Sequence, residues 1–465
     1  MPVLPFLSYV HFPAVSGNIL PEPFQPGLGS PSGMIDLMKV TTIIPIMMLL
    51  ILCMRPDNAA SAFHDGGVGA CDACHSMHNA SPLAGDSLLK SSDPSSTCLN
   101  CHQNTGDIGP TSYHVSTALS DMPPGAPPKQ LTPAGDFGWL KKTFTWLPSA
   151  SGILQFSYGD RHGHNIIAND FQYAADMTNS TAPGGAYPAL SLTCISCHDP
   201  HGKYRRDAAG SIATTGTPIQ GSGSYASSAG PQAGSSVGVY RLLGGRNYHP
   251  RNLLGSFAFL NDPPAAVAPD AYNRSETGTQ TRVAYGSGMS DWCQNCHTTM
   301  HTIISSGTPT IPKTHPVGSL AKLGPTMSTN YNMYVKTGVL TGIVNTSFLS
   351  LVPFEEGTSD YSALKAHARS DDSYLFGPDS GSSQVMCLTC HRAHASGWDH
   401  ATRWNTNTDH IVFNGFYSQD GQTYQPYGQG RTELEAQKAY YDMRAGRFAL
   451  NQDTLCHKCH GGALP

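Results

Sequence analysis

Twelve of the 13 cysteines form six Cys-x-x-Cys pairs, and a histidine directly follows each pair. The paired cysteines are Cys71 and Cys74, Cys98 and Cys101, Cys194 and Cys197, Cys293 and Cys296, Cys387 and Cys390, and Cys456 and Cys459. The histidines are His75, His102, His198, His297, His391 and His460. Two thiols three residues apart lie on one helical turn, where both can form thioether bonds to a porphyrin while the next imidazole binds its iron. The spacing therefore predicts six covalent c-type haems, with these histidines as proximal iron ligands.

Disulfide bonds and structural zinc are the other common uses of paired cysteines. Disulfides suit an exported protein, but they give no reason for a histidine after every pair. Structural zinc sites combine such pairs at short, regular intervals, whereas successive motifs here start 27, 96, 99, 94 and 69 residues apart. Attached haem is the interpretation that uses every residue of the pattern.

The sixth position of each haem iron decides whether the protein conducts electrons or reacts with a substrate. Nine histidines outside the motifs are distal candidates, of which we expect six to be ligands: His64, His78, His114, His164, His201, His301, His315, His367 and His394. Four of these follow a proximal histidine by three or four residues: His78, His201, His301 and His394. Each of the four shares a helical turn with that ligand, so it cannot reach the far face of the same porphyrin. We expect such histidines to bind a neighbouring haem.

Apart from His11 in the leader, the remaining histidines are interpreted as bystanders: His162, His249, His400, His410 and His457. A haem enzyme would need one iron with an open face, marked by a Cys-x-x-Cys-Lys motif or a shortage of distal histidines. Neither marker is present in the sequence. We therefore predict an electron-transfer protein without catalytic residues. A multihaem reductase and a soluble monomeric electron shuttle are the alternatives.

The elements that position these motifs are short. The chain has 48 Gly and 35 Pro with only 13% charged and 39% hydrophobic residues, which argues against a helix bundle, a coiled coil or a charged disordered tail. We expect a small strand hairpin at 137–147, a helix at 433–448 and a loop at 208–238. The predicted fold is a multihaem cytochrome c, mostly coil with short helices and very little β structure, in which the haem chain serves as the core.

Residues 1–62 are interpreted as a leader. The apolar run 40–54 has 15 residues, which is short for a membrane span of about 20. It precedes the small-residue site Ala60-Ser61-Ala62, so we predict a signal peptide at about 34–62, cleaved before Phe63. A start at Met34 or Met38 would make 1–33 an artefact of the gene model. Residues 63–465 would then form one exported hexahaem domain with no membrane span, and the net charge of −5 gives no support to nucleic-acid binding.

Long segments of the chain resemble the OmcS-type hexahaem cytochromes, which polymerise into extracellular filaments. The segments are FHDGGVGACDACHSMHN (63–79), CLNCHQNTGDIGPTSYH (98–114), CISCHDPHGKYRR (194–206), GSIATTGTPI (210–219), TRVAYGSGMSDWCQNCH (281–297), PFEEGTSDY (353–361) and CLTCHRAHASG (387–397). The resemblance covers almost all of 63–465 and extends well outside the haem motifs. It implies bis-histidine ligation at six haems, little secondary structure and long-range electron transfer at the outer cell surface.

The resemblance also implies how subunits join. In this family the histidine three after the first proximal ligand, here His78, binds the iron of the fifth-motif haem, here that of His391, in the next subunit. A heterologous contact of this kind produces an open filament. Periplasmic or outer-membrane cytochromes would donate electrons, and extracellular acceptors such as metal oxides would receive them. This sequence departs from the pattern in its leader and at His400, His410 and His457, none of which removes a ligand candidate.

Overall fold

Short helices separated by irregular segments make up the described part of the chain. The computed structural model describes residues 71–461 except 79, 83–86, 104–105, 107–108, 149–151, 254, 277–279, 301–314, 320, 335–341, 349–350 and 418–427. These residues belong to one compact unit, Asn58–Pro465. The predicted leader and its cleavage before Phe63 lie outside the described residues. Within the described ranges, every helix is too short or too polar to cross a membrane.

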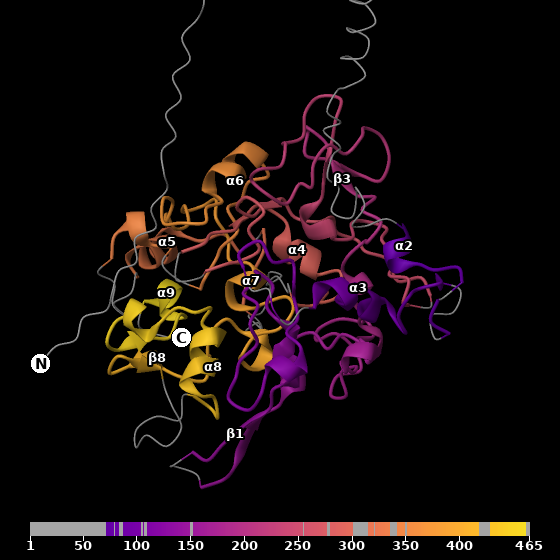
Figure 1. Ribbon diagram of the computed structural model, residues 1–465. Helices are drawn as coiled ribbons and strands as arrows, with labels where there is room; N and C mark the ends of the chain where they lie inside the picture. The colour runs from indigo at the N-terminus through magenta and orange to yellow at the C-terminus, as the bar shows by residue number, and fades with distance from the viewer. Residues whose placement is uncertain are drawn as a thin grey trace, which may run out of the picture. The chain divides into compact units, whose positions relative to one another are not determined.

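The α-helices are brief and most of them carry a haem motif. They are α2 (Cys71–Cys74), α3 (Pro94–His102), α4 (Met289–Cys293), α5 (Pro325–Met333), α6 (Tyr361–His367), α7 (Cys387–Cys390), α8 (Glu433–Ala439) and α9 (His457–His460). The 3₁₀-helices are η2 (Leu119–Asp121), η3 (Phe137–Lys141), η4 (Gly159–Arg161), η5 (Asn169–Phe171), η6 (Ala189–Ser191), η7 (Cys194–Ser196), η8 (Tyr240–Leu242), η9 (Val344–Thr346), η10 (Asp399–Ala401) and η11 (Ala445–Arg447). Figure 1 shows α2, α3, α4, α7 and α9 in chain order across the view.

The strands form small antiparallel sheets of two or three members. Strand β1 (Phe144–Trp146) pairs with β2 (Gln155–Ser157), and β6 (Ala266–Val267) pairs with β7 (Ala284–Tyr285). Strand β3 (Arg205–Arg206) lies between β4 (Ile212–Ala213) and β5 (Val237–Gly238). Strand β8 (His410–Phe413) lies between β9 (Phe416–Tyr417) and β10 (Gln452–Asp453). The predicted class, mostly coil with short helices and little β structure, is confirmed.

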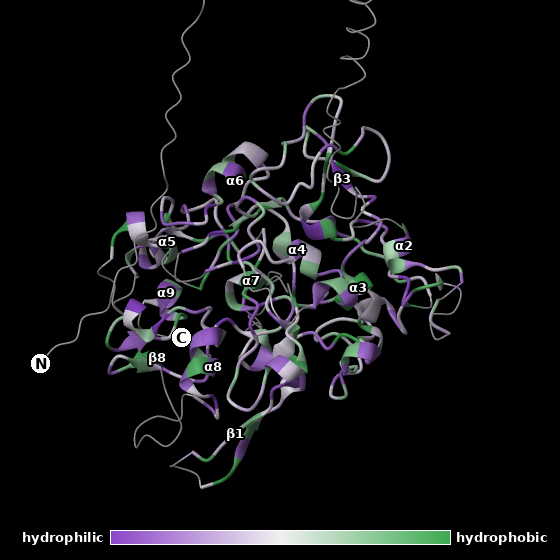
Figure 2. Ribbon diagram, in the orientation of Figure 1, coloured by the Kyte–Doolittle hydropathy of each residue, from purple (hydrophilic) through white to green (hydrophobic). Residues whose placement is uncertain are grey.

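Buried apolar side chains in the described residues form five separate clusters instead of one continuous core. The largest is rich in aromatic rings such as Trp139, Trp398 and Tyr440, and Cys390, Cys456 and Cys459 pack against it. Figure 2 accordingly shows hydrophobic residues in short stretches scattered along the chain. The largest cluster, and a smaller one around Leu99 and Phe137 that contacts Cys194, thus lie against cysteines that the sequence assigns to haem attachment.

Three local predictions need correction. The segment 208–238, predicted as a loop, contains β4 and ends in β5, both paired with β3. Phe137–Lys141 forms η3 and not a strand, because Asp136 caps this turn by accepting a hydrogen bond from Gly138 N at 2.7 Å. Only Phe144–Trp146 of the predicted hairpin segment pairs as a strand. The helix predicted at 433–448 ends at Ala439, since Tyr441 and Asp442 adopt φ of 57° and 59°, which an α-helix does not accommodate.

Candidate haem sites

Each cysteine pair lies on or beside a tight helical turn. The amide N–H of the proximal histidine donates to the carbonyl of the first cysteine in five motifs, over 2.8 Å at His75, 3.0 Å at His198, 3.1 Å at His297, 3.0 Å at His391 and 3.2 Å at His460. In the second motif, His102 ends α3. The twelve motif cysteines form no disulfide. This turn places both thiols and the following imidazole on one side of the backbone, as haem attachment requires.

The proximal imidazoles are oriented by backbone carbonyls. Nδ1 donates to a carbonyl oxygen in five motifs: His75 to Ser87 (2.9 Å), His102 to Tyr113 (2.8 Å), His198 to Arg241 (2.8 Å), His297 to Pro183 (2.8 Å) and His391 to His400 (2.8 Å). Such a bond holds the proton on Nδ1 and leaves the Nε2 lone pair for a metal. These acceptors are far from the motifs in sequence or lie in loops, so no sequence pattern identifies them.

Four proximal histidines lie opposite a histidine from the candidate distal set. The ring-centre separations are 6.5 Å for His75 and His201, 6.4 Å for His198 and His394, 6.1 Å for His297 and His164, and 5.9 Å for His460 and His315. Two imidazoles on opposite faces of one iron, with metal–nitrogen bonds of about 2 Å, place their ring centres about 6 Å apart. The four pairs therefore have the spacing that a bis-histidine haem requires.

The surroundings of the paired histidines favour the neutral, metal-binding form. Burial lowers the pKa of His394 to about 3, and burial also lowers the pKa of His164. The Nδ1 of His164 donates to Ala393 O at 2.5 Å, and that of His315 donates to Pro316 O at 2.8 Å. Neutral imidazole is the form that coordinates a metal, so burial prepares these rings for ligation.

The other distal candidates lie in different surroundings. His78 is exposed, and no imidazole lies opposite it or His391 among the described residues. His367 stacks on Tyr374 with ring centres 4.3 Å apart, and its Nδ1 lies 2.5 Å from a Glu356 carboxylate oxygen. His64 and His301 lie outside the described residues. The buried His114 contacts Ser112 through Nδ1 at 3.0 Å. The structure thus leaves the rings opposite His102 and His391 to be assigned.

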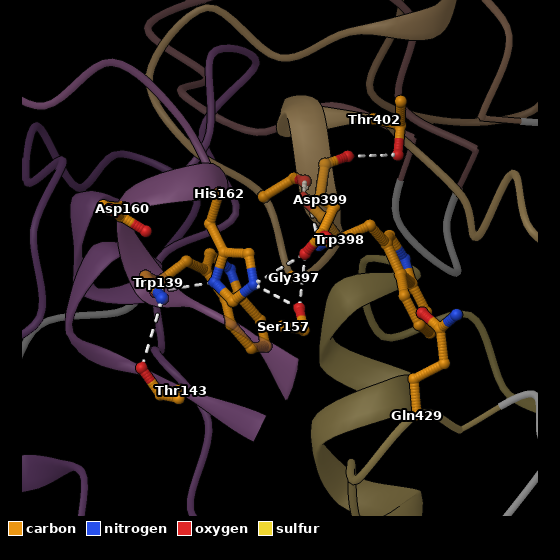
Figure 3. Close-up of polar contacts among 12 residues, drawn as sticks. Trp139, Thr143, Ser157, Asp160, His162, Gly397, Trp398, Asp399, Thr402 and Gln429 are labelled. Carbon is orange, nitrogen blue, oxygen red and sulfur yellow. Dashed lines mark hydrogen bonds and ion pairs between the residues drawn. The ribbon is translucent and has the colours of Figure 1, made fainter. Parts of the chain in front are cut away.

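His162 shows how a buried histidine can be unavailable to iron. Its Nδ1 donates to Trp139 O at 3.0 Å and its Nε2 lies 2.8 Å from Ser157 Oγ, as Figure 3 shows. Asp399 approaches the same Nε2 at 3.5 Å. Both ring nitrogens have partners, so His162 braces the β1–β2 hairpin against η10.

Successive motifs are joined directly at two places. The amide of Cys194 donates to Ser95 Oγ in α3 over 3.0 Å, and the amide of Cys387 donates to Ser290 Oγ in α4 over 3.1 Å. At both places the first cysteine of one motif lies within hydrogen-bond reach of the first cysteine of the next. The two serines each lie three residues before a motif cysteine, a role that the sequence alone does not reveal.

The described residues contain no group of three or more His, Cys, Asp or Glu side chains placed to hold a bare metal ion. The opposed histidine pairs instead have the separation that two ligands of one haem iron would need. Together with the cysteine turns, they fit covalent haem at successive positions along the chain.

Comparison with known proteins gives the same assignment. No protein-family model matches the chain. The chain is 52% identical over 439 residues to the C-type cytochrome OmcS of Geobacter sulfurreducens, an alignment that covers 91% of this chain and 98% of that protein. A cryo-EM structure of OmcS nanowires from that organism matches with a TM-score of 0.79, covering 86% of this chain and 100% of that chain. A second structure, of the Outer Membrane Cytochrome S filament, matches with a TM-score of 0.78.

Proposed function

This chain belongs to the OmcS family of c-type cytochromes, and from that premise we propose that it carries electrons over long distances outside the cell, along a filament of identical subunits. The observation that carries the proposal is the set of four opposed histidine pairs, because an iron saturated by two imidazoles exchanges electrons without binding a substrate. When bound, each haem supplies a one-electron iron centre within a conjugated ring.

The chain's own residues hold those centres in place. The twelve motif cysteines provide thioether anchors for six haems, and the six histidines that follow them provide proximal ligands. The carbonyls bonded to Nδ1 keep the imidazoles from rotating. A ligand set that does not rearrange keeps the cost of each electron transfer small. The motif junctions at Ser95 and Ser290 fix successive attachment sites next to one another.

The ligands of the odd-numbered motifs follow a simple order. His201, after motif 3, lies opposite His75 of motif 1, and His394, after motif 5, lies opposite His198 of motif 3. Each of these histidines would therefore bind the haem iron of the motif two places earlier in the chain. Continuing the order, His78 after motif 1 would serve His391 of motif 5, which a single chain does not bring together.

The even-numbered motifs follow a second order. His164 lies between motifs 2 and 3 in sequence and opposes His297 of motif 4, and His315 lies between motifs 4 and 5 and opposes His460 of motif 6. The ligand for His102 of motif 2 would then precede motif 1, where His64 is located. His114, His301 and His367 would then not be ligands. With this assignment, each of the six irons in a filament has two histidine ligands.

The unpaired ligands give the assembly its direction. His78 of one subunit would coordinate the fifth-motif iron of the next, so each subunit completes a site in its neighbour, and the contact repeats without closing. The exposure of His78 supports this role. We further propose secretion across the inner membrane after removal of the leader, electron donors among periplasmic or outer-membrane cytochromes, and extracellular acceptors such as metal oxides.

Carbon monoxide binding tests the saturation of the irons. The reduced filament should bind no carbon monoxide, because every iron has two histidine ligands. Uptake at one haem per subunit in intact filaments would favour a reductase. Image reconstruction of extracellular material then tests assembly, and finding only dispersed monomers would favour the shuttle.

A further inference from the structure

Two arginines share one glutamate beside the fifth motif. Arg392 Nη1 lies 3.1 Å from Glu276 Oε2, and Arg403 Nη1 lies 2.9 Å from Glu276 Oε1. The side chains of both arginines are 0% exposed and that of Glu276 is 2% exposed. The Tyr441 ring covers Arg392, with its centre 3.3 Å from Cζ. Protein atoms thus enclose two positive charges and one negative charge.

The charge of this cluster is not balanced. Arg392 Nε and Nη2 and Arg403 Nη2 have no hydrogen-bond partner among the described residues. Arginine stays protonated in proteins, so with an ionised Glu276 the cluster carries a net charge of about +1. By contrast, the buried pair Arg282 and Glu356, 2.9 Å apart, has one charge of each sign.

The cluster is fixed to the peptide that carries the proximal ligand. Arg392 directly follows His391, and its amide donates to Ala401 O at 2.7 Å. Arg403 Nε donates to Leu388 O at 2.5 Å and to His391 O at 3.2 Å. The Arg403 guanidinium is therefore bonded to the motif itself, and Arg392 continues the backbone of the motif.

We propose that the Arg392–Glu276–Arg403 cluster is a fixed positive charge that raises the reduction potential of the haem on motif 5. Reduction of that haem adds one electron, delivered by the preceding carrier, and so adds one negative charge. An uncompensated positive charge in a low-dielectric interior stabilises the reduced form relative to the oxidised form. The inference rests on the proposed electron-transfer function and assigns one site within it a distinct potential.

Two substitutions that change the cluster charge in opposite directions test this. Arg392→Met brings the net charge to zero and Glu276→Gln brings it to about +2, in the haem-loaded protein. We fit a spectroelectrochemical titration with six one-electron components. The reduction potential of one component should fall with Arg392→Met and rise with Glu276→Gln. Each should change the reduced-to-oxidised ratio of that haem at least tenfold at fixed potential, which is 59 mV for one electron. The other five components should stay in place.

The controls separate charge from disturbance of the fold. Arg392→Lys keeps the charge and should leave the component in place. Arg246→Met removes a charge whose pair with Asp262 is solvent-exposed and should shift no component. If Arg392→Met loses haem, Arg403→Met makes the same charge change. Three results would overturn the proposal. The reduction potential could shift in the same direction in Arg392→Met and Glu276→Gln, it could shift in all six components, or it could not shift at all.

The two proposals can fail separately. If the protein forms only dispersed subunits, but one potential falls with Arg392→Met and rises with Glu276→Gln, the filament proposal is wrong and the charge proposal stands. If normal filaments form but neither variant shifts a potential, the charge proposal is wrong and the filament proposal stands. The His78→Ala variant identifies the component, because it opens the iron of the same motif 5.

Discussion

The junction of motifs 2 and 3 and the junction of motifs 4 and 5 use the same hydrogen bond but begin their helices differently. At both, a serine hydroxyl oxygen accepts a hydrogen bond from a cysteine amide: Ser95 accepts from Cys194 over 3.0 Å and Ser290 from Cys387 over 3.1 Å. Helix α3 is capped by its own neighbour Asp93, which accepts from Ser96 N at 2.8 Å. Helix α4 instead starts at Gly288, with φ of 102°, whose amide donates to the distant Glu355.

This difference shows that one arrangement of cofactor sites can be stabilised by local or by long-range contacts. The cap of α3 comes from the residue directly before the helix, whereas the cap of α4 requires the segment around Glu355 to be folded. The first motif contrasts with both, because α2 has no buried residue. The proposed filament contact would place another subunit near this helix.

The largest expected effect is at that first motif. His78→Ala should abolish long filaments, because it removes the proposed ligand between subunits, and should open one iron per subunit to carbon monoxide. Electron microscopy and carbon monoxide titration of the reduced protein measure both. The control is His249→Ala, at another exposed histidine, whose Nδ1 donates to Phe257 O at 3.0 Å. If the His78 variant still forms long filaments, His78 is not the ligand that joins one subunit to the next.

The second prediction concerns the long-range cap. Burial raises the pKa of Glu355 to about 7, so the folded state binds its proton more tightly than the unfolded state, whose pKa is about 4.5. This stabilisation is complete below about pH 4.5 and is lost as pH rises to about 7, a change of about 3 kcal/mol. Glu355→Gln should remove that pH dependence, as measured by denaturant unfolding across this range.

Glu356 is the matched control for Glu355. Burial opposes ionisation there, but the hydrogen bond from His367 and the charge of Arg282 lower the pKa of Glu356. Its stabilising contribution is therefore present at neutral pH and lost in acid. Glu356→Gln should change stability with the opposite pH dependence. Identical profiles for the two variants would contradict a special role of Glu355 at the second junction.

The smallest effect tests what the two junctions share. Ser95→Ala and Ser290→Ala should each lower the free energy of unfolding by about 1–3 kcal/mol, because each leaves a cysteine amide without its acceptor. The two losses should be similar and should add in the double variant. Thermal unfolding of the haem-loaded protein measures them, with the exposed Ser180→Ala as control. Unequal losses would mean that the caps, and not the shared bond, dominate the junctions.

Sequence alone was informative where the chemistry is local. The turn that carries each proximal histidine depends on neighbouring residues, so spacing and residue type predict it. The cap from Glu355, the carbonyl that orients His297 and the partners of His162 come from residues far away in sequence. The strand predicted at Phe137 failed for a local reason, because the cap at Asp136 outweighed the strand preference of the aromatic residues that follow.

The distance in sequence between a proximal histidine and its proposed distal ligand also sets an order in time. The site of His75 cannot be completed until His201 has been made and exported, and that of His198 must wait for His394. Maturation of motifs 1 and 3 would therefore lag behind synthesis by two motifs, whereas the proposed ligands of motifs 2, 4 and 6 precede their motifs in the chain. The site of His391 waits longest, for a different molecule, so each newly released subunit would carry one unfinished iron until it meets a neighbour.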